Sequence, residues 1–298
     1  MNWKSLMFMF GGIVLGSSTM NAQTNLLNAT VPDEIGKKTE KQLVADNDKP
    51  LPYGYIDDRD MLWSKVVWEY IDLNERLNLP YYYPIHEAST SKNRKSLYQT
   101  LLDAIVDGEL TEIYDDSYFT TKLTKEEIEN KLYRIDTLDA GFEAIEYGED
   151  PSEFIERVEI NPKDIVGFKI KGVWYVDKRQ GELKYRLLAI APVAPDVQTK
   201  GRDDIESEDL PMFWVWYPSS RELLHNMKIF NQKNSAFPIS FDHMMNARRF
   251  TAVIYREENL YGNRDVKDYV KGNALFQVLE SDRIRESIRE KELDLWNY

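Results

Sequence analysis

Apolar residues recur along the chain with two different periods, and the change of period separates two regions. From residue 57 to residue 79 the apolar positions lie three or four residues apart, which predicts a buried helix that ends before Pro80. These positions are Leu62, Val66, Tyr70, Leu73 and Leu77. The next segment, Pro80 to Pro84, contains two prolines that disfavour helix and three tyrosines that must pack or face a ligand.

Two further helices are predicted in the first region. One runs from about residue 92 to residue 107 and stops at Gly108, a residue that commonly ends helices. The other begins at Thr124, because Thr124 and Glu127 have the spacing of a capping box. Residues 56–160 are therefore predicted to be a mainly helical region.

From about residue 164 the apolar period changes to two. Residues 166–176 and 183–189 alternate in polarity, and the segment 178–181 between them ends in a glycine, which together predict a β-hairpin. Later segments predict strands at 212–217 and 249–255 and a long helix from about Asn273. Residues 161–298 are thus predicted to be an α+β region. The predicted fold class is α+β, with a helical N-terminal half, an antiparallel sheet in the C-terminal half and a long C-terminal helix.

Two of the predicted helices carry apolar residues on more than one face. Met61 and Trp68 lie off the main stripe of the first helix, so they either form a second contact surface or are covered by another element of the same domain. In the last helix Ile284 and Ile288 lie nearly opposite the face of Leu275, Val278 and Leu279, so this helix either breaks near Ser281 or touches two bodies. The residues predicted to contact a partner are Met61, Trp68, Ile284, Ile288 and Trp296.

The first residues have the layout of a signal peptide. Lys4 precedes a ten-residue, mainly apolar run, and small polar residues follow it, so residues 1–22 are predicted to be removed after Ala22. Residues 23–55 are polar and are predicted to be a flexible arm, either a plain spacer or a segment that folds on a partner. No later segment is apolar enough to span a bilayer. We therefore expect an extracytoplasmic protein whose membrane attachment depends on a partner.

Charge and composition narrow the possible functions. A net charge of −13 disfavours binding to nucleic acid and to anionic lipid, and the complete lack of cysteine excludes disulfides, thiolate sites and lipoprotein acylation. Three scattered histidines have no metal-ligand spacing, and Ser219 and Ser220 fit helix caps better than a nucleophile elbow. We expect no catalytic, cofactor-binding or metal-binding residues.

Large aromatic residues are abundant, with 7 Trp, 18 Tyr and 12 Phe. Such residues pack in cores, concentrate at protein interfaces and line carbohydrate grooves. Two functions of different classes therefore remain open. One is a structural subunit of an assembly, and the other is a soluble periplasmic glycan-binding module or hydrolase.

Two blocks of residues carry a resemblance to a known family. The first comprises Val67 to Leu73, Asn78 and Pro80 to Pro84. The second comprises Trp216 to Pro218, Arg221, Phe230, Asn231, Lys233, Asn234, Ser240 to Asp242, Arg248, Phe250, Tyr255, Glu258, Asn259, Tyr261, Arg264, Gly272, Glu280 to Ile284 and Asp294 to Trp296. With these residues, the chain from about Asp57 onward resembles the GldN/PorN proteins of Bacteroidetes gliding motility and type IX secretion.

The resemblance implies a role in a large assembly. It implies a periplasmic subunit that forms a ring with an outer-membrane lipoprotein of the GldK/PorK type, at the inner face of the outer membrane. Implied further partners are copies of itself or neighbouring ring subunits and a motor component of the GldM/PorM type. The ring would export adhesins and enzymes. The resemblance implies no catalytic residue. Charge, composition and the apolar pattern described above lead us to expect no cofactor, no nucleic-acid partner and no direct membrane insertion.

Overall fold

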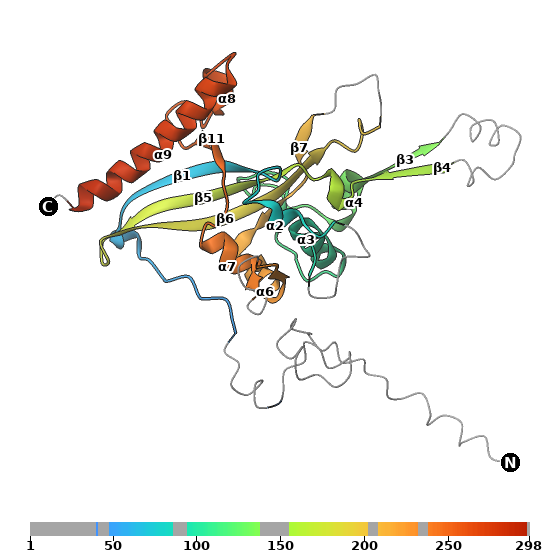
Figure 1. Ribbon diagram of the computed structural model, residues 1–298, viewed down its shortest axis with the longest axis horizontal. Helices are drawn as coiled ribbons and strands as arrows, with labels where there is room; N and C mark the ends of the chain where they lie inside the picture. Colours follow the sequence, from blue (N-terminus) through green and yellow to red (C-terminus); the bar gives the residue numbers. More distant parts are fainter. Residues whose placement is uncertain are drawn as a thin grey trace, which may run out of the picture. The chain divides into compact units, whose positions relative to one another are not determined.

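A central antiparallel sheet organises the protein. The computed structural model describes residues 40, 48–85, 94–137, 155–201, 208–231 and 238–296, so the predicted signal peptide, residues 1–22, lies outside the described residues. Seven strands form the sheet in the order β11-β1-β5-β6-β8-β2, with β7 against β6 (Figure 1). They are β1 (Met61–Asp72), β2 (Ile113–Tyr114), β5 (Gly167–Asp177), β6 (Glu182–Pro195), β7 (Asp209–Pro211), β8 (Trp214–Trp216) and β11 (Val253–Glu257).

The predicted hairpin is confirmed by β5 and β6. These strands pair from Gly167 opposite Val193 to Asp177 opposite Glu182. Gly181 closes the turn with a φ of +64°, and its amide donates to the carbonyl of Asp177 at 2.7 Å. A glycine suits this position because side chains make a positive φ unfavourable. The antiparallel sheet and the C-terminal helix of the predicted α+β fold are both present.

The helix predicted over residues 57–79 is wrong, because residues 61–72 form strand β1. This strand pairs with β5 along its length and with β11 at residues 67–70. Its middle is buried on both sides: Val67 packs in the cluster of Ile284, whereas Trp68 packs in the cluster of Trp214. Burial on both sides removes the alternation by which a strand is recognised, and the remaining spacing resembles that of a helix. The helical N-terminal half is therefore not confirmed.

Three α-helices lie between residues 48 and 137 of the described chain. They are α2 (Leu79–Tyr82), α3 (Leu97–Val106) and α4 (Lys125–Leu132). The last two confirm the predicted helices, and the capping box of Thr124 and Glu127 is present. In contrast, α2 shows that the prolines do not exclude helix. Pro80 lies in the first turn, where its missing N–H is not needed.

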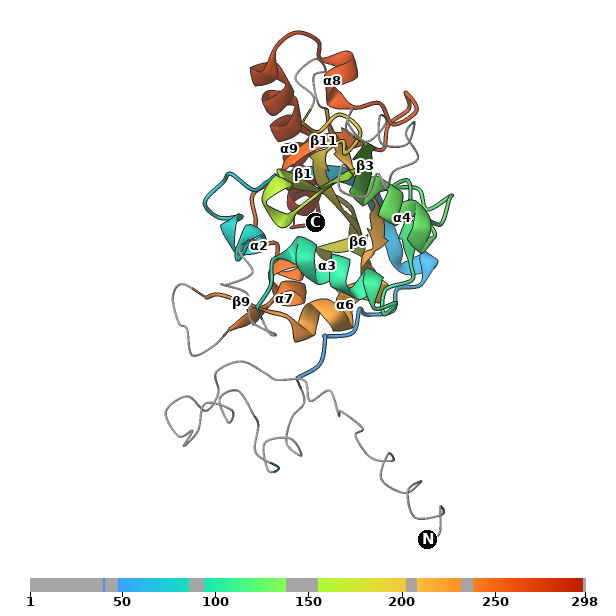
Figure 2. The same ribbon diagram turned by 90° about the vertical axis from the view of Figure 1, so that its right-hand side faces the viewer.

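The main hydrophobic core lies between the sheet and a group of helices. It joins residues of β5 and β6 to residues of α3, α6 (Tyr217–Asn226) and α7 (Phe241–Asn246). Figure 2 shows these helices on one side of the strands and α8 (Val266–Tyr269) and α9 (Ala274–Trp296) on the other. This arrangement gives α9 its own contact with the sheet, separate from the main core.

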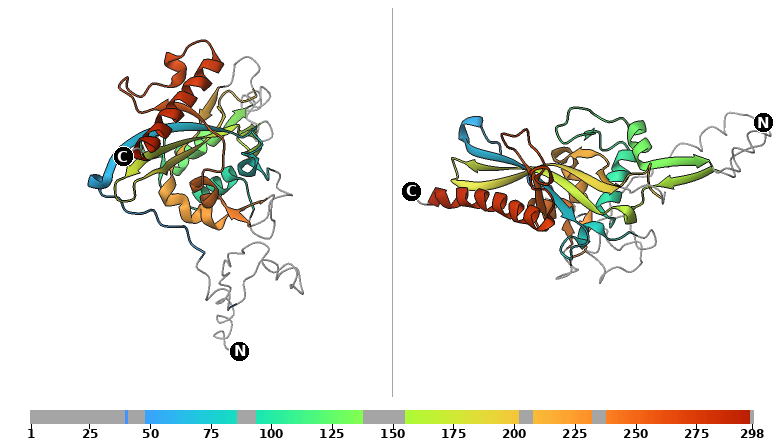
Figure 3. Two further views of the ribbon diagram at one scale, coloured as in Figure 1. Left: turned by 60° about the vertical axis from the view of Figure 1, so that its left-hand side comes forward. Right: turned by 90° about the horizontal axis from the view of Figure 1, so that it is seen from above.

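Two small strand pairs lie apart from the central sheet. Strand β9 (Lys228–Ile229) pairs with β10 (Ile239–Ser240), and β3 (Tyr133–Thr137) pairs with β4 (Ile155–Glu159). The β3–β4 pair extends from the sheet on the side away from α9 (Figure 3). Ile135 on this pair is largely exposed.

Candidate interaction surface

The second half of α9 is fixed to the sheet. Ile284 and Ile288 are buried with Val67 and Ile254, and the backbone amide of Ile254 donates to the hydroxyl of Ser281 at 2.8 Å. The guanidinium of Arg285 donates to the backbone carbonyl of Ala252, the residue before β11, at 2.7 Å. These contacts hold one face of α9 against β11, so this part of the helix belongs to the folded body.

The first half of the same helix carries apolar side chains that the described chain covers only in part. Leu275 is 64 % exposed, Phe276 56 %, Val278 45 % and Leu279 52 %. We call these four residues the α9 apolar surface. No charged residue lies between Gly272 and Leu279. Contiguous exposed apolar residues are unusual on a monomer and indicate a surface that binds another molecule.

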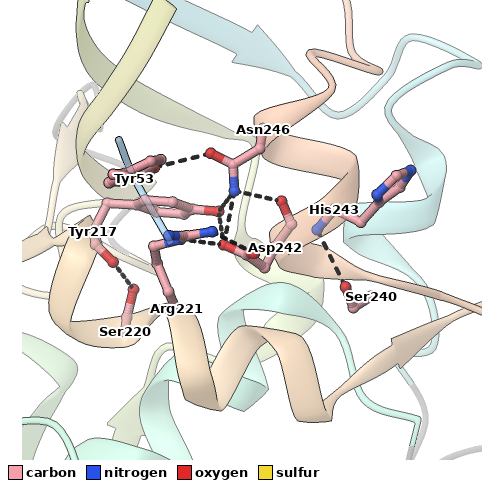
Figure 4. A network of polar contacts seen from close by, with 8 residues as sticks. All are labelled: Tyr53, Tyr217, Ser220, Arg221, Ser240, Asp242, His243 and Asn246. Atoms are coloured by element: carbon pink, nitrogen blue, oxygen red, sulfur yellow. Dashed lines mark hydrogen bonds and ion pairs between the residues drawn. The ribbon is translucent and has the colours of Figure 1, made fainter. Parts of the chain in front are cut away.

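A buried ion pair joins α6 to α7 on the other side of the sheet (Figure 4). The carboxylate of Asp242 accepts from Arg221 at 2.8 and 3.0 Å, from the Tyr217 hydroxyl at 3.0 Å and from the Asn246 amide at 2.8 Å. Burial, and then the charge of Asp242, raise the pKa of Tyr217. The hydroxyl of Tyr53 donates to Asn246, and the Tyr53 ring lies 4.1 Å from the Arg221 guanidinium. The network thus ties the segment before β1 to the helices.

The contacts around this network are those of a structural site. The hydroxyls of Ser219 and Ser220 donate to carbonyls three residues earlier. Both serines lie inside α6, whose N-cap residue is Trp216 and has no side-chain cap, so the predicted role of these serines as helix caps is wrong. The hydroxyl of Ser240 accepts from the backbone amide of His243 and caps α7. The ring of His225 is paired with Asp48 at 2.7 Å. The serines and His225 therefore make contacts that hold the fold together.

A second buried ion pair lies between β1 and Arg248, the second residue after α7. Glu69, 1 % exposed, accepts from Arg248 at 2.7 and 2.9 Å and from the Tyr185 hydroxyl at 3.3 Å. The Arg248 guanidinium also lies 4.1 Å from the Tyr185 ring. Burial, followed by the charge of Glu69, raises the pKa of Tyr185 well above its ordinary value. The pair joins residues that are 179 positions apart in sequence.

A third polar contact holds the loop after β2 on the sheet. The ammonium of Lys171 donates to the Ser117 carbonyl at 2.7 Å and lies about 5 Å from the rings of Trp68, Tyr118 and Phe119. Burial lowers the pKa of Lys171, although the charge of Asp116 opposes this effect. We call these residues the Lys171 cluster. A cation enclosed by aromatic rings is held by their negative faces.

Among the residues that the structure describes, no group of three or more His, Asp or Glu side chains could hold a metal ion. No helix in the described ranges combines the length and apolar composition that a bilayer span requires. The buried polar groups described above are instead satisfied by one another. The α9 apolar surface is the candidate interaction site because its four exposed apolar side chains are close together on one helix.

Comparison with known families agrees with this picture. The family described as "Gliding motility associated protein GldN" matches residues 56–297. The chain belongs to the GldN family. A comparison with curated proteins finds no match. Membership of the GldN family associates the chain with gliding motility and type IX secretion.

The residues that carry the GldN resemblance gather at the structural contacts. Tyr217, Arg221 and Asp242 form one buried network, and Arg248 closes the other with Glu69. Ser281 fixes α9 to the sheet. Within this GldN-family chain, these matched residues therefore stabilise the fold and position α9.

The residues predicted to contact a partner are placed differently from one another. Met61 is 40 % exposed, whereas Trp68 is 1 % exposed and donates to Ser117, so another element of the same domain covers it. Ile284 and Ile288 are buried against the sheet of their own chain, and the side chain of Trp296 lies outside the described residues.

The α9 helix is unbroken near Ser281. The large apolar side chains of α9 that are exposed in the described chain are therefore those of the α9 apolar surface and Leu293. The sequence pattern shows both apolar faces of this helix, and the face of Ile284 and Ile288 is the one predicted above to contact a partner. The signal that distinguishes the faces is the absence of charge from residue 272 to residue 279.

Proposed function

We propose that this GldN-family chain is a non-enzymatic, periplasmic structural subunit of the type IX secretion and gliding machinery. It forms a ring with an outer-membrane lipoprotein of the GldK/PorK type, at the inner face of the outer membrane, and is needed for export of adhesins and enzymes. Further partners are neighbouring ring subunits and the GldM/PorM-type motor component. The observation that carries the proposal is the exposed α9 apolar surface in a chain of this family.

The internal chemistry of the chain supports a structural role. Asp242 and Glu69 each accept several hydrogen bonds from fixed partners, and their neighbouring tyrosines have raised pKa values. Groups engaged in this way stabilise a fold, because a buried charge is retained only when it is paired. The hydrogen bonds of these groups join separate elements of the same fold, which supports a structural role for them.

The aromatic residues support the same reading. The largest side chains that are fully buried include Trp68, Tyr81, Tyr98, Phe213 and Phe241. They fill the interior and do not line a carbohydrate groove. The aromatic content that left a glycan-binding function open is thus partly explained by packing of the core.

The test is capture of the lipoprotein partner from the envelope of the source cells. A tagged full-length chain is expressed in a strain that lacks the native gene, and the lipoprotein that co-purifies with it is identified by mass spectrometry. We expect capture of a GldK/PorK-type lipoprotein and recovery of type IX cargo export. Normal cargo export in the deletion strain, or failure of the functional tagged chain to retain the lipoprotein, would refute the proposal.

A further inference from the structure

A pocket lies beside the α9 apolar surface. Its volume is about 370 Å³, and its wall is formed by β1, β5, β11, α8 and the first half of α9. The apolar part of the wall includes Val253, Val266 and Val278. Val278 also belongs to the α9 apolar surface, so the pocket and that surface form one continuous region.

Two lysines give this region a positive character. Lys169 and Lys267 line the pocket, and in the described part of the chain neither ammonium group has a hydrogen bond or an ion pair. The ammonium of Lys169 lies 5.3 Å from the Tyr255 ring, and burial lowers its pKa against the opposing effect of Asp265. The only acidic residue of the pocket wall, Asp265, is already paired with Arg256.

A positive, apolar region is unusual on a chain with a net charge of −13. The chemistry of this region indicates what it binds. A binding partner that carries carboxylates and apolar side chains would form ion pairs with the two lysines and cover the α9 apolar surface. Burial of the apolar residues would provide most of the affinity, and the charges would provide orientation.

The chain itself contains a segment of the required chemistry. Residues 138–154, which join β3 to β4, contain six acidic residues and no lysine or arginine. The same segment contains Leu138, Phe142, Ile145, Tyr147 and Phe154. The predicted N-terminal arm is a poorer match, because residues 23–47 contain three lysines and no aromatic residue.

The direction of β3 and β4 favours contact with a second copy. These strands extend from the sheet on the side away from α9 (Figure 3). Thr137 and Ile155, the described residues that flank the segment, are paired at the end of these strands. They lie away from α9 of the same chain, which favours a neighbouring molecule as the binding partner of the segment.

We propose that the α9 apolar surface, with Lys169 and Lys267, binds the acidic β3–β4 connection, residues 138–154, of a second copy of this chain. The contact joins two different surfaces and is therefore heterologous, so repetition produces a closed ring or an open filament. The proposal rests on the proposed function, because it specifies how neighbouring ring subunits bind one another.

The experiment measures self-association of the mature full-length chain by analytical ultracentrifugation over a range of concentrations. Leu275→Glu disrupts the α9 apolar surface, and Leu293→Glu is its matched control, because Leu293 is 55 % exposed on the same helix. Glu143→Lys with Glu146→Lys reverses charge in the acidic connection. Circular dichroism confirms that each variant is folded.

The wild-type chain is expected to form oligomers whose size increases with concentration. Leu275→Glu and the double lysine variant should each raise the dissociation constant at least about tenfold, whereas Leu293→Glu should leave it unchanged. A mixture of Leu275→Glu with the double lysine variant retains one intact surface on each molecule. It should form a one-to-one dimer that grows no further, and low salt should strengthen it.

Three results would overturn the proposal. They are a wild-type chain that stays monomeric at every concentration, equal effects of Leu275→Glu and Leu293→Glu, and failure of the mixture to form the dimer. A fourth result would identify a different occupant: if Leu275→Glu abolishes capture of the lipoprotein but leaves self-association intact, the surface binds the lipoprotein. That result refutes this proposal and supports the proposed function, so the two can fail independently.

Discussion

Removal of one carboxylate should show how strongly the network around Asp242 stabilises the fold. Asp242 is 3 % exposed and Arg221 is 8 % exposed, and the guanidinium meets the carboxylate through two hydrogen bonds. Asp242→Ala leaves a buried cation without its partner and leaves Tyr217 without its acceptor. Breaking a buried pair in this way costs about 3–5 kcal/mol. A loss of that size is a large fraction of the roughly 5–15 kcal/mol that stabilises a typical domain.

The assay is equilibrium unfolding in urea, followed by tryptophan fluorescence and circular dichroism. The control is Asp282→Ala, which breaks the exposed pair with Arg285 on α9 and should cost at most about 1 kcal/mol. Replacing both Arg221 and Asp242 by leucine should cost less than Asp242→Ala alone, because no unpaired charge remains. If Asp242→Ala lowers the free energy of unfolding no more than the control does, the network does not stabilise the fold as argued.

Three further predictions concern other parts of the fold. Gly172→Ala should lower the stability measured in a thermal melt by about 1–3 kcal/mol, because the added Cβ would lie 2.1 Å from the hydroxyl of Tyr185. Gly54→Ala should have little effect, because no atom lies within 4 Å of the added Cβ. Burial raises the pKa of Tyr217 in the folded state, so the contribution of this residue to stability should be constant below about pH 10, where the unfolded phenol ionises, and should decrease above it; a urea midpoint that stays constant above pH 10 would contradict this. Ser281→Ala should cost about 1–3 kcal/mol in urea unfolding, since it removes the acceptor of a buried amide, and Ser287→Ala, whose hydroxyl bonds within its own helix, should change stability far less.

The parts of the fold that depend on residues close together in the sequence could be predicted from it. The β5–β6 hairpin has alternating polarity and a turn closed by Gly181, and α4 begins at the capping box of Thr124 and Glu127. Strand β1 could not be recognised, because its partner β11 lies far along the chain and its middle is buried on both sides. The pattern of apolar residues reports burial and does not report which element causes it.

The candidate surface was predicted in part. The opposed apolar faces of α9 are visible in the sequence, but the face that packs on the sheet depends on contacts with Val67 and Ile254. The buried pairs of Arg221 with Asp242 and of Arg248 with Glu69 join distant positions that no local motif connects. Their geometry follows from strand register and helix placement, which a single sequence does not specify.

The alternation of side chains along β1 restricts how this strand can change in length. Val67 and Glu69 point to one side, toward α9 and Arg248, and Trp68 points to the other, toward the Lys171 cluster. A deletion or insertion of one residue would exchange the two sides of the strand. The Trp68 indole would then lie against the Arg248 guanidinium, and the Glu69 carboxylate would lie among the aromatic rings of the Lys171 cluster. Gaps of odd length within residues 66–70 should therefore be absent from functional relatives, even where individual side chains differ.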